Sequence, residues 1–331
     1  MTQWPLDWTA LVDEAIRRRK SEGLTQATLG ELAGVSTPTV NAFERGEINL
    51  RLETVASILG VLGMFERPGP PDSFGMFRHQ SRRRWNELTE PLPQHHPARQ
   101  PLGYVEHSYS LDCEIEGLTL SGLRRVLSRM PKTSGWTPFW VPTREDLKPA
   151  IRDGSVECWL GKPDVERFHE DAAHSDFWQV TPDIYAYLRR GYQEDGESNL
   201  DPGTIFDVTL PIWRTAEVLL HAANLAARID AKPNDTIQYA ARYTGLEGRD
   251  LLAWASPRLI FEPGRPLRAQ STKADISVRT SSEEVQDALE QVIARCLPPL
   301  YERFDGYEAP QSLIVNQVAE FQQSVLQFSV R

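Results

Sequence analysis

The sequence predicts a multi-domain protein with an all-α bundle at the N-terminus and a larger α+β domain at the C-terminus. Apolar residues recur only at helical spacing in the first 65 residues. A proline-rich stretch follows, and the remainder mixes alternating, strand-like segments with amphipathic helical ones. These segments show no regular βαβ order, which favours α+β. We expect domains at residues 1–65 and 103–331, joined by an extended linker at residues 66–102.

Two short helices with a tight turn between them are predicted for residues 24–46. Thr25 can cap the first helix, and Gly34 suits the left-handed conformation that ends it. Ser36 or Thr37 can cap the second helix, with Pro38 in its first turn. The inward positions are apolar: Leu29, Leu32, Ala33, Val40 and Phe43.

Apolar stripes on both sides of these helices complete a compact bundle. They comprise Trp8, Leu11, Val12, Ala15 and Ile16 before the pair, and Leu52, Val55, Ile58, Leu59 and Leu62 after it. The outward face of the second helix instead carries short polar groups and a basic end, a composition that suits base edges and phosphates. Its members are Thr37, Pro38, Thr39, Asn41 and Arg45.

Residues 8–64 resemble the Cro/C1 repressor (Xre-type) helix-turn-helix family. The matching pattern is Leu24-Thr25-Gln26, Leu32-Ala33, Gly34-Val35-Ser36, Thr39-Val40 and Glu44-Arg45-Gly46. The resemblance implies a helix-turn-helix bundle whose second helix enters the DNA major groove. It also implies that Gln26 contacts a phosphate, that Thr37, Pro38 and Asn41 face bases, and that Thr39 and Arg45 touch the backbone. Ser36 completes the predicted DNA-binding set.

Two positions depart from the family pattern. Pro38 has no hydrogen-bonding side chain, so readout there would be apolar, against a group such as a thymine methyl. Arg51 stands where a capping Ser or Asp is common, which predicts a weak cap for the next helix. A bundle that mediates only protein contacts is the structural alternative.

The excess of acidic over basic side chains is confined to the C-terminal part of the chain. The net charge is −10, yet residues 1–99 hold equal numbers of basic and acidic side chains. Local potential steers DNA binding, so the total charge does not exclude it. Two basic clusters stand out, at residues 17–20 and 82–84. We expect the second cluster either to contact DNA outside the main site or to form a solvated turn.

No targeting, membrane or disulfide pattern is evident. No apolar run approaches the ~20 residues that span a bilayer, and the N-terminus lacks a signal-peptide pattern. Cys113, Cys158 and Cys296 are odd in number and widely spaced, which suggests reduced cytosolic thiols. We therefore predict a cytoplasmic protein with no cofactor and no metal.

Strands and helices are both predicted in the second domain. Strands are expected at residues 104–115, 156–160, 176–180, 184–192, 205–210 and 237–243, with helices at 118–130 and 212–229. Six of the nine tryptophans lie in this domain. Tryptophans either line a ligand cleft or fill a core. The candidate pocket residues are Trp136, Trp140 and Trp159.

A second resemblance covers residues 103–310. Several sequence segments are similar to a C-terminal module of some bacterial proteins that begin with a Schlafen-like DNA-binding domain. These segments are residues 136–142, 157–161, 176–178, 190–195 and 206–214. That module carries no assigned chemistry, so the resemblance implies only a combination with different DNA-associated domains.

No catalytic constellation is predicted. His169-Glu170 with His174 lacks the i, i+4 spacing of a zinc helix, and there is no phosphate-binding glycine loop. Two acidic groups are ambiguous between a carboxylate site and a solvated or structural role. They are Asp112, Glu114 and Glu116, and Glu194-Asp195 with Asp207.

The C-terminal tail holds two amphipathic stretches, from Val285 to Ile293 and from Val318 to Leu326. They either pack on the domain core or form a dimer interface. Taken together, we expect a cytoplasmic transcription regulator, a dimeric repressor that binds double-stranded operator DNA and takes a small-molecule or protein effector. The alternatives are an antitoxin or defence-system protein that binds a protein partner, and an enzyme with a DNA-binding head.

Overall fold

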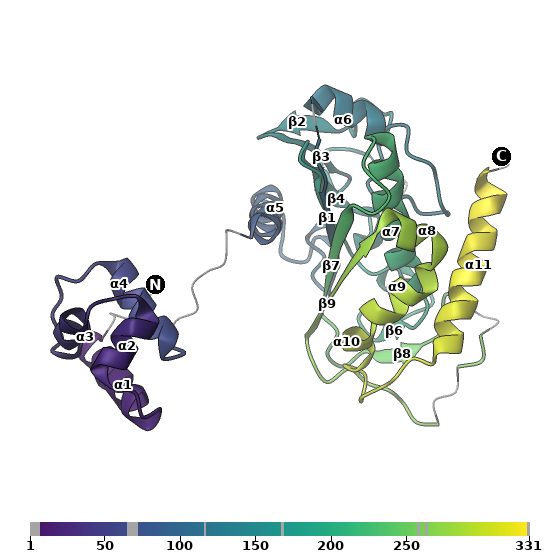
Figure 1. Cartoon of the computed structure of the whole chain (residues 1–331). Coiled ribbons are helices and arrows are strands. Elements are labelled where there is room, and N and C mark those ends of the chain that lie inside the picture. Colours follow the sequence, from purple (N-terminus) through teal and green to yellow (C-terminus); the bar gives the residue numbers. More distant parts are fainter. Residues whose placement is uncertain are drawn as a thin grey trace. The chain divides into compact units, whose positions relative to one another are not determined.

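Figure 1 shows a computed structural model of the chain. The structure describes residues 7–64, 72–115, 117–166, 169–256, 259–261 and 264–329. The chain divides into two compact units, Met1–Asp72 and Ser73–Arg331. Among the described residues, no helix combines the length and apolarity needed to cross a lipid bilayer.

The first unit is a bundle of short helices: α1 (Trp8–Ser21), α2 (Gln26–Ala33), α3 (Thr37–Glu44) and α4 (Leu52–Val61). The predicted caps are confirmed, since Thr25 accepts the backbone N–H of Thr28 and Ser36 accepts that of Thr39. Arg51 makes no side-chain cap, as the sequence predicts. The core contains Val12, Ala15, Leu29, Val40, Phe43, Val55, Ile58, Leu59 and Leu62.

The turn between α2 and α3 depends on Gly34, whose φ is +67° and whose N–H bonds the carbonyl of Glu31. A side chain here would meet no neighbour within 4 Å, so a substitution is strained by conformation alone. We expect Gly34→Ala to destabilise the first unit by about 1–2 kcal/mol. Amide exchange measured on peptides from residues 7–64 of the full chain would show the loss. Equal protection in Gly34→Ala and the wild type would contradict this prediction.

The second unit is built on a fully antiparallel sheet in the order β2-β3-β4-β5-β1-β7-β9. Its strands are β1 (Val105–Asp112), β2 (Ala150–Arg152), β3 (Ser155–Trp159), β4 (Phe177–Val180), β5 (Tyr185–Arg190), β7 (Thr236–Thr244) and β9 (Lys273–Ser281). A short parallel pair, β6 (Ile205–Asp207) and β8 (Asp250–Leu252), lies apart from it. This sheet with its helices confirms the predicted α+β class.

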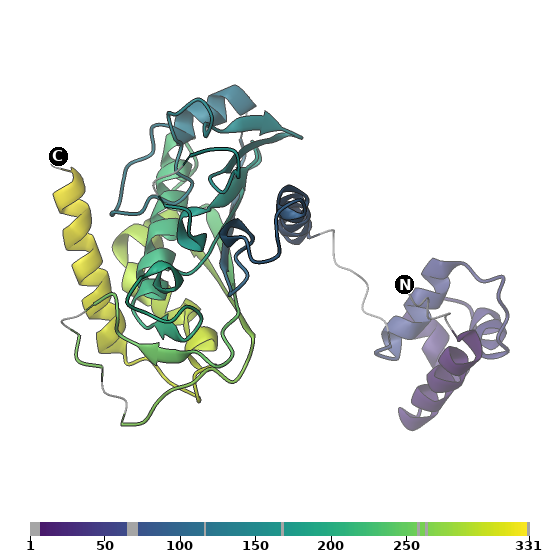
Figure 2. The ribbon, with the colours of Figure 1, turned by 180° about the vertical axis from the view of Figure 1, so that it is seen from behind.

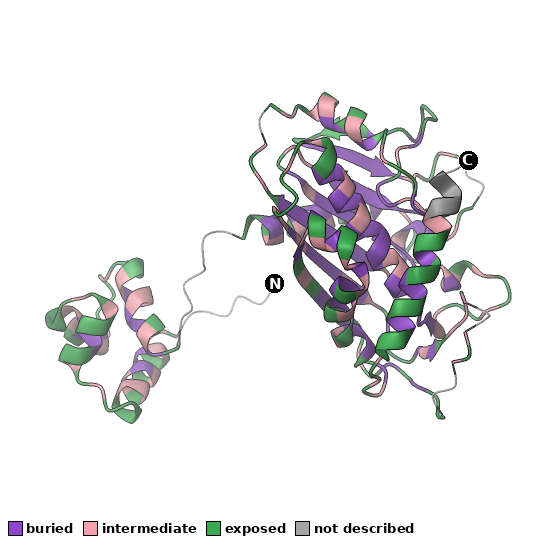
Figure 3. Cartoon of the chain, turned by 45° about the vertical axis from the view of Figure 1, so that its right-hand side comes forward, coloured by how far each residue is buried: buried purple, intermediate pink, exposed green. Residues whose placement is uncertain are grey.

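Helices cover both faces of the large sheet, as the opposite views in Figures 1 and 2 show. One face packs against α7 (Leu210–Arg228), α8 (Ser282–Asp287) and α9 (Leu289–Cys296), with α6 (Leu120–Leu127) and α10 (Pro298–Tyr301) nearby. Figure 3 shows that the central strands of the sheet are largely buried in this arrangement, whereas β2 is exposed and β9 alternates between exposed and buried residues. Short 3-10 turns η1 (Pro97–Arg99), η2 (Ala172–His174) and η3 (Glu194–Gly196) lie in the connections.

The opposite face of the sheet carries α5 (Ser73–Thr89), which corrects the expected linker at residues 66–102. Phe77 and Trp85 of this helix pack with Tyr187 of β5, and α5 belongs to the second unit. The prolines that suggested an extended chain lie on both sides of a proline-free window, residues 72–90, where the helix forms. Residues 65–71 lie outside the described part of the chain.

The C-terminal helix α11 (Gln311–Ser329) packs on α7 and α9. Its residues Leu313, Ile314, Val318 and Phe321 are buried in the main core, and Trp213 lies edge-on to Phe321. These contacts match the domain-core interpretation of the tail. A chain cut at Asp305 would therefore lose part of its core.

Candidate nucleic-acid interface and ligand pocket

Helix α3 presents the predicted recognition face. Thr37, Pro38, Asn41 and Arg45 are exposed, while Val40 and Phe43 on the opposite side are buried. The helix is held from behind, because Trp8 lies edge-on to Phe43 and its indole N–H donates to the carbonyl of Gly46 at 3.0 Å. The outward side chains are thus carried on a fixed scaffold.

Two of the predicted contact residues are already engaged within the helix. The hydroxyls of Ser36 and Thr39 bond to one another at 2.7 Å, and Ser36 caps α3. The side chains of Thr37 and Asn41 therefore offer the better hydrogen-bonding groups for base edges. Arg45, at the C-terminal cap of α3, has a weak contact with Glu47 at 3.8 Å and remains exposed.

Glu44 links three elements of the first unit and was missed by the sequence reasoning. Its carboxylate accepts hydrogen bonds from Arg19 of α1 and from the Nε2 of Gln26 at 2.7 Å. Partial burial opposes ionisation, but the bonds from Arg19 and Gln26 outweigh it and lower the pKa of Glu44. This network fixes Gln26 at the start of α2, where the resemblance places a phosphate contact.

The two basic clusters are largely compensated. Arg17 and Arg18 bond to Glu14, and Arg19 bonds to Glu44, which leaves Lys20 as an exposed cation of the first cluster. In the second unit Arg82 pairs with the fully buried Glu106 at 2.7 Å, and Arg84 pairs with Glu157 at 3.0 Å. Arg82 and Arg84 therefore anchor α5 to the sheet. Their side chains form neither a solvated turn nor a contact that is available to DNA.

A cavity of about 810 Å³ lies in the second unit, and two of the candidate pocket residues, Trp136 and Trp140, line it. Trp159 is elsewhere, since it is 7% exposed in the cluster formed with Phe77 and Trp85 of α5. Strand alternation explains this correction, because β3 directs the Trp159 side chain to the α5 face of the sheet.

Two arginines frame Trp136 in this cavity. The guanidinium of Arg190 lies 4.5 Å from the ring centroid, and that of Arg214 lies 4.8 Å from it. The indole N–H donates to Asp176 at 3.2 Å. These partners come from β5, α7 and the residue before β4, so no local sequence signal could have grouped them.

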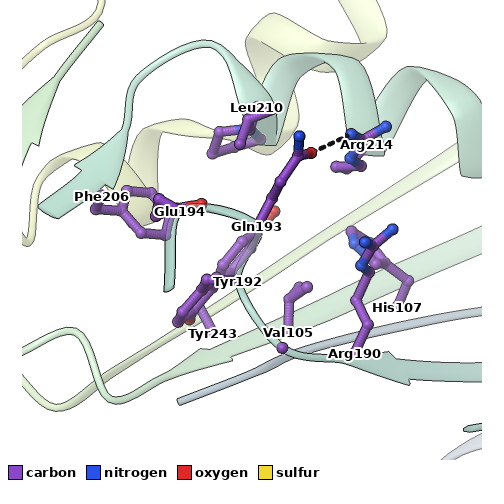
Figure 4. Close-up of a pocket in the computed structure, with 12 residues that line it drawn as sticks. Val105, His107, Arg190, Tyr192, Gln193, Glu194, Phe206, Leu210, Arg214 and Tyr243 are labelled. Carbon is purple, nitrogen blue, oxygen red and sulfur yellow. Dashed lines mark hydrogen bonds between the residues drawn. The ribbon is translucent and has the colours of Figure 1, made fainter. Parts of the chain in front are cut away.

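A second, much smaller cavity adjoins the first and shares Arg190, Gln193 and Arg214 with it (Figure 4). Its volume of about 30 Å³ is that of one water molecule in the liquid, so it is too small for a ligand. His107 lines it and bonds the hydroxyl of Tyr239 at 2.8 Å. Burial, with the nearby charges of Arg190 and Arg214, lowers the pKa of His107 to about 3, so this imidazole is neutral at pH 7.

His169, Asp171 and His174 are brought together at the rim of the larger cavity. Their ligand atoms lie within 4.8 Å of one another, and the two imidazole rings stack at 4.3 Å. His174 lies in the short turn η2, which Asp171 caps through the backbone N–H of His174. The expectation of no metal was based on the spacing of the two histidines, which does not suit a zinc-binding helix. In the structure a turn, not a helix, brings the three side chains together. Two imidazoles and a carboxylate could hold a divalent transition metal.

Of the two acidic groups that were ambiguous from sequence, the one formed by Glu194, Asp195 and Asp207 has structural partners. Asp207 accepts the N–H groups of Thr209 and Leu210 at the start of α7, and its own N–H donates to Glu194 at 3.1 Å. Asp195 pairs with Arg249 at 2.7 Å. Asp112 and Glu114 are exposed at the end of β1, and Glu116 lies outside the described residues.

Glu194 gives the second unit a specific pH dependence. Burial raises its pKa from 4.5 to about 7. Between these values the unfolded chain ionises while the folded chain keeps its proton, so the free energy of unfolding falls as pH rises from 4.5 to 7. We expect Glu194→Gln to remove this part of the slope, by about 1–3 kcal/mol across the window. Urea unfolding at a series of pH values tests it, and an unchanged slope in Glu194→Gln would refute it.

Comparison with known proteins places the first unit in a class. Residues 16–64 match a family described as Helix-turn-helix. The chain is also 39% identical over 54 residues to an uncharacterized HTH-type transcriptional regulator of Haemophilus influenzae (strain ATCC 51907 / DSM 11121 / KW20 / Rd). The alignment covers 16% of this chain and 55% of the relative, so the chain spans about half the length of the curated relative that it matches. The resemblance of residues 103–310 to the Schlafen-associated module stays a prediction.

Proposed function

We propose that the protein is a sequence-specific regulator of transcription that binds double-stranded operator DNA through α3 and acts as a dimeric repressor. The observation that carries this proposal is the exposed face of Thr37, Pro38 and Asn41 on a helix fixed by caps and core packing. The helix-turn-helix match over residues 16–64 supports it. Gln26 and Arg45 flank this face and would contact phosphates.

Binding to the DNA around the protein's own gene tests the proposal. The full chain is titrated with that DNA and with random DNA of equal length, at several salt concentrations. We expect tight binding to one segment of the own-gene DNA and weaker, more salt-sensitive binding to random DNA. Equal, weak binding to both DNAs that vanishes with salt would contradict specific readout of this region.

A dimer is proposed because helix-turn-helix dimers place two recognition helices ~34 Å apart on a palindrome. Ile48, in the connection between α3 and α4, and Leu52, the first residue of α4, support it because they are 80% and 82% exposed in this small unit. We expect the full chain to sediment as a dimer and the double variant Ile48→Asp, Leu52→Asp to sediment as a monomer. A variant that stays dimeric would place the interface elsewhere.

The second unit is proposed to sense a small-molecule effector in the cavity lined by Trp136 and Trp140. Its volume of about 810 Å³ is within the range of ligand pockets. We expect an effector to change operator affinity, which fluorescence anisotropy on labelled DNA would measure.

A further inference from the structure

Basic side chains outnumber acidic ones in the lining of the cavity of about 810 Å³. Lys132, Arg144, Arg190 and Arg214 line it, against the carboxylate of Asp176. Arg144 is paired with Asp146 and Arg214 with Glu217, so these two cations are largely compensated. Lys132 is exposed at the rim, and Arg190 is buried inside.

Arg190 is incompletely satisfied by the protein. Its side chain is 6% exposed, and its Nη2 donates to the carbonyl of Ala173 at 2.6 Å. The nearest carboxylate oxygen, Oδ1 of Asp176, is 3.7 Å from its Nε, which is too long for a hydrogen bond. Its Nη1 is buried and has no hydrogen-bond partner. A buried cationic donor without a partner is costly unless a ligand satisfies it.

Two tryptophans, Trp136 and Trp140, line the same cavity as Arg190. Trp140 is 46% exposed although it is one of the largest apolar side chains, and its backbone is fixed by a bond from the indole of Trp178 to its carbonyl at 3.1 Å. The guanidinium groups of Arg190 and Arg214 lie 4.5 and 4.8 Å from the ring centroid of Trp136. Aromatic rings favour offset stacking with another ring.

We propose that this cavity binds a small molecule that carries both an anionic group, a carboxylate or a phosphate, and a planar aromatic ring. The anion accepts from Nη1 of Arg190 with Lys132 nearby, and the ring stacks on Trp140. This proposal rests on the proposed sensor role of the second unit and names the chemical class of its effector.

Calorimetric titration of the full-length protein without DNA tests the proposal. The probes are benzoate and AMP, which carry a carboxylate and a phosphate, with benzamide and adenosine as their uncharged counterparts. We expect at least one anion to bind roughly tenfold or more tightly than its counterpart, because a hydrogen bond between charged groups is stronger than one to a neutral group. The anion that binds distinguishes a carboxylate effector from a nucleotide.

Variants at exposed positions keep the test independent of folding. Lys132→Ala and Trp140→Ala should each weaken binding of the anion severalfold, whereas Lys273→Ala, an exposed lysine on β9, should leave it unchanged. The proposal is overturned if neither anion binds at millimolar concentration, if the uncharged counterparts bind equally well, or if both pocket variants bind as the wild type does. Operator binding is measured separately, so loss of this proposal leaves the DNA-binding proposal standing.

Discussion

The double variant Thr37→Ala, Asn41→Ala is expected to lose specific DNA binding by about a hundredfold or more. Both side chains are exposed on α3 and face away from the core. A good contact to a base edge contributes about 1–3 kcal/mol of discrimination, so two lost contacts remove most of the preference for the operator. Binding to random DNA should barely change, because phosphate contacts supply it.

The matched control removes the same two side-chain types elsewhere. Thr9 in the first turn of α1 and Asn86 on α5 are exposed, so Thr9→Ala, Asn86→Ala should bind the operator as the wild type does. Competition binding with operator and random DNA measures both variants, and amide exchange over α3 checks that the helix remains folded. An operator affinity in the first variant equal to that of the control would place readout on other residues.

Arg249→Ala is expected to destabilise the second unit by about 3–5 kcal/mol, because it leaves a buried charge unpaired. The Arg249 side chain is fully buried and donates to both carboxylate oxygens of Asp195, at 2.8 and 2.7 Å. It also donates to the carbonyls of Leu102, Ile205 and Gly245. Asp195, whose side chain is 5% exposed, would lose its cation.

An exposed pair supplies the control for this effect. Arg268 and Asp250 form an ion pair at 2.8 Å, with side chains 58% and 31% exposed, so Arg268→Ala should cost no more than about 1 kcal/mol. Urea unfolding followed by tryptophan fluorescence reports mainly on the second unit, which holds most tryptophans. Arg249→Lys keeps the charge but loses the bidentate geometry, and should fall between the two. Equal losses in Arg249→Ala and Arg268→Ala would refute the argument.

The sequence predicted the first unit well because its signals are local, although Leu32, predicted to face the core, is 59% exposed. Thr25 and Ser36 cap helices within three residues, and Gly34 supplies a conformation that other residues adopt at a cost. Most strands and helices of the second unit were located, but the short strands β2 and β8 and the long strand β9 were missed. The inward side of β9 holds Ala274 and Ile276 among polar residues, a weak alternation.

Helix α5 shows why the linker prediction was wrong. Prolines and low hydrophobicity suggested an extended segment, although Phe74, Met76, Phe77 and Trp85 indicated that part of it could dock on a domain. The three consecutive arginines suggested either a DNA contact or a solvated turn. Arg82 and Arg84 form ion pairs with Glu106 and Glu157, which lie on strands further along the chain. The sequence alone therefore did not indicate that these two charges are paired. Packing of Phe77 and Trp85 on the sheet then makes the helix part of the domain.

The sequence by itself determined the helix-turn-helix order, the caps and the polar outward face of α3, because these depend on residues a few positions apart. Only the tertiary structure decided which tryptophans share a cavity. It separated Trp159 from Trp136 and placed Arg190 and Arg214 on the ring of Trp136. Such groupings depend on strand pairing and on which face of the sheet a residue occupies, and a one-residue difference in a strand reverses that face.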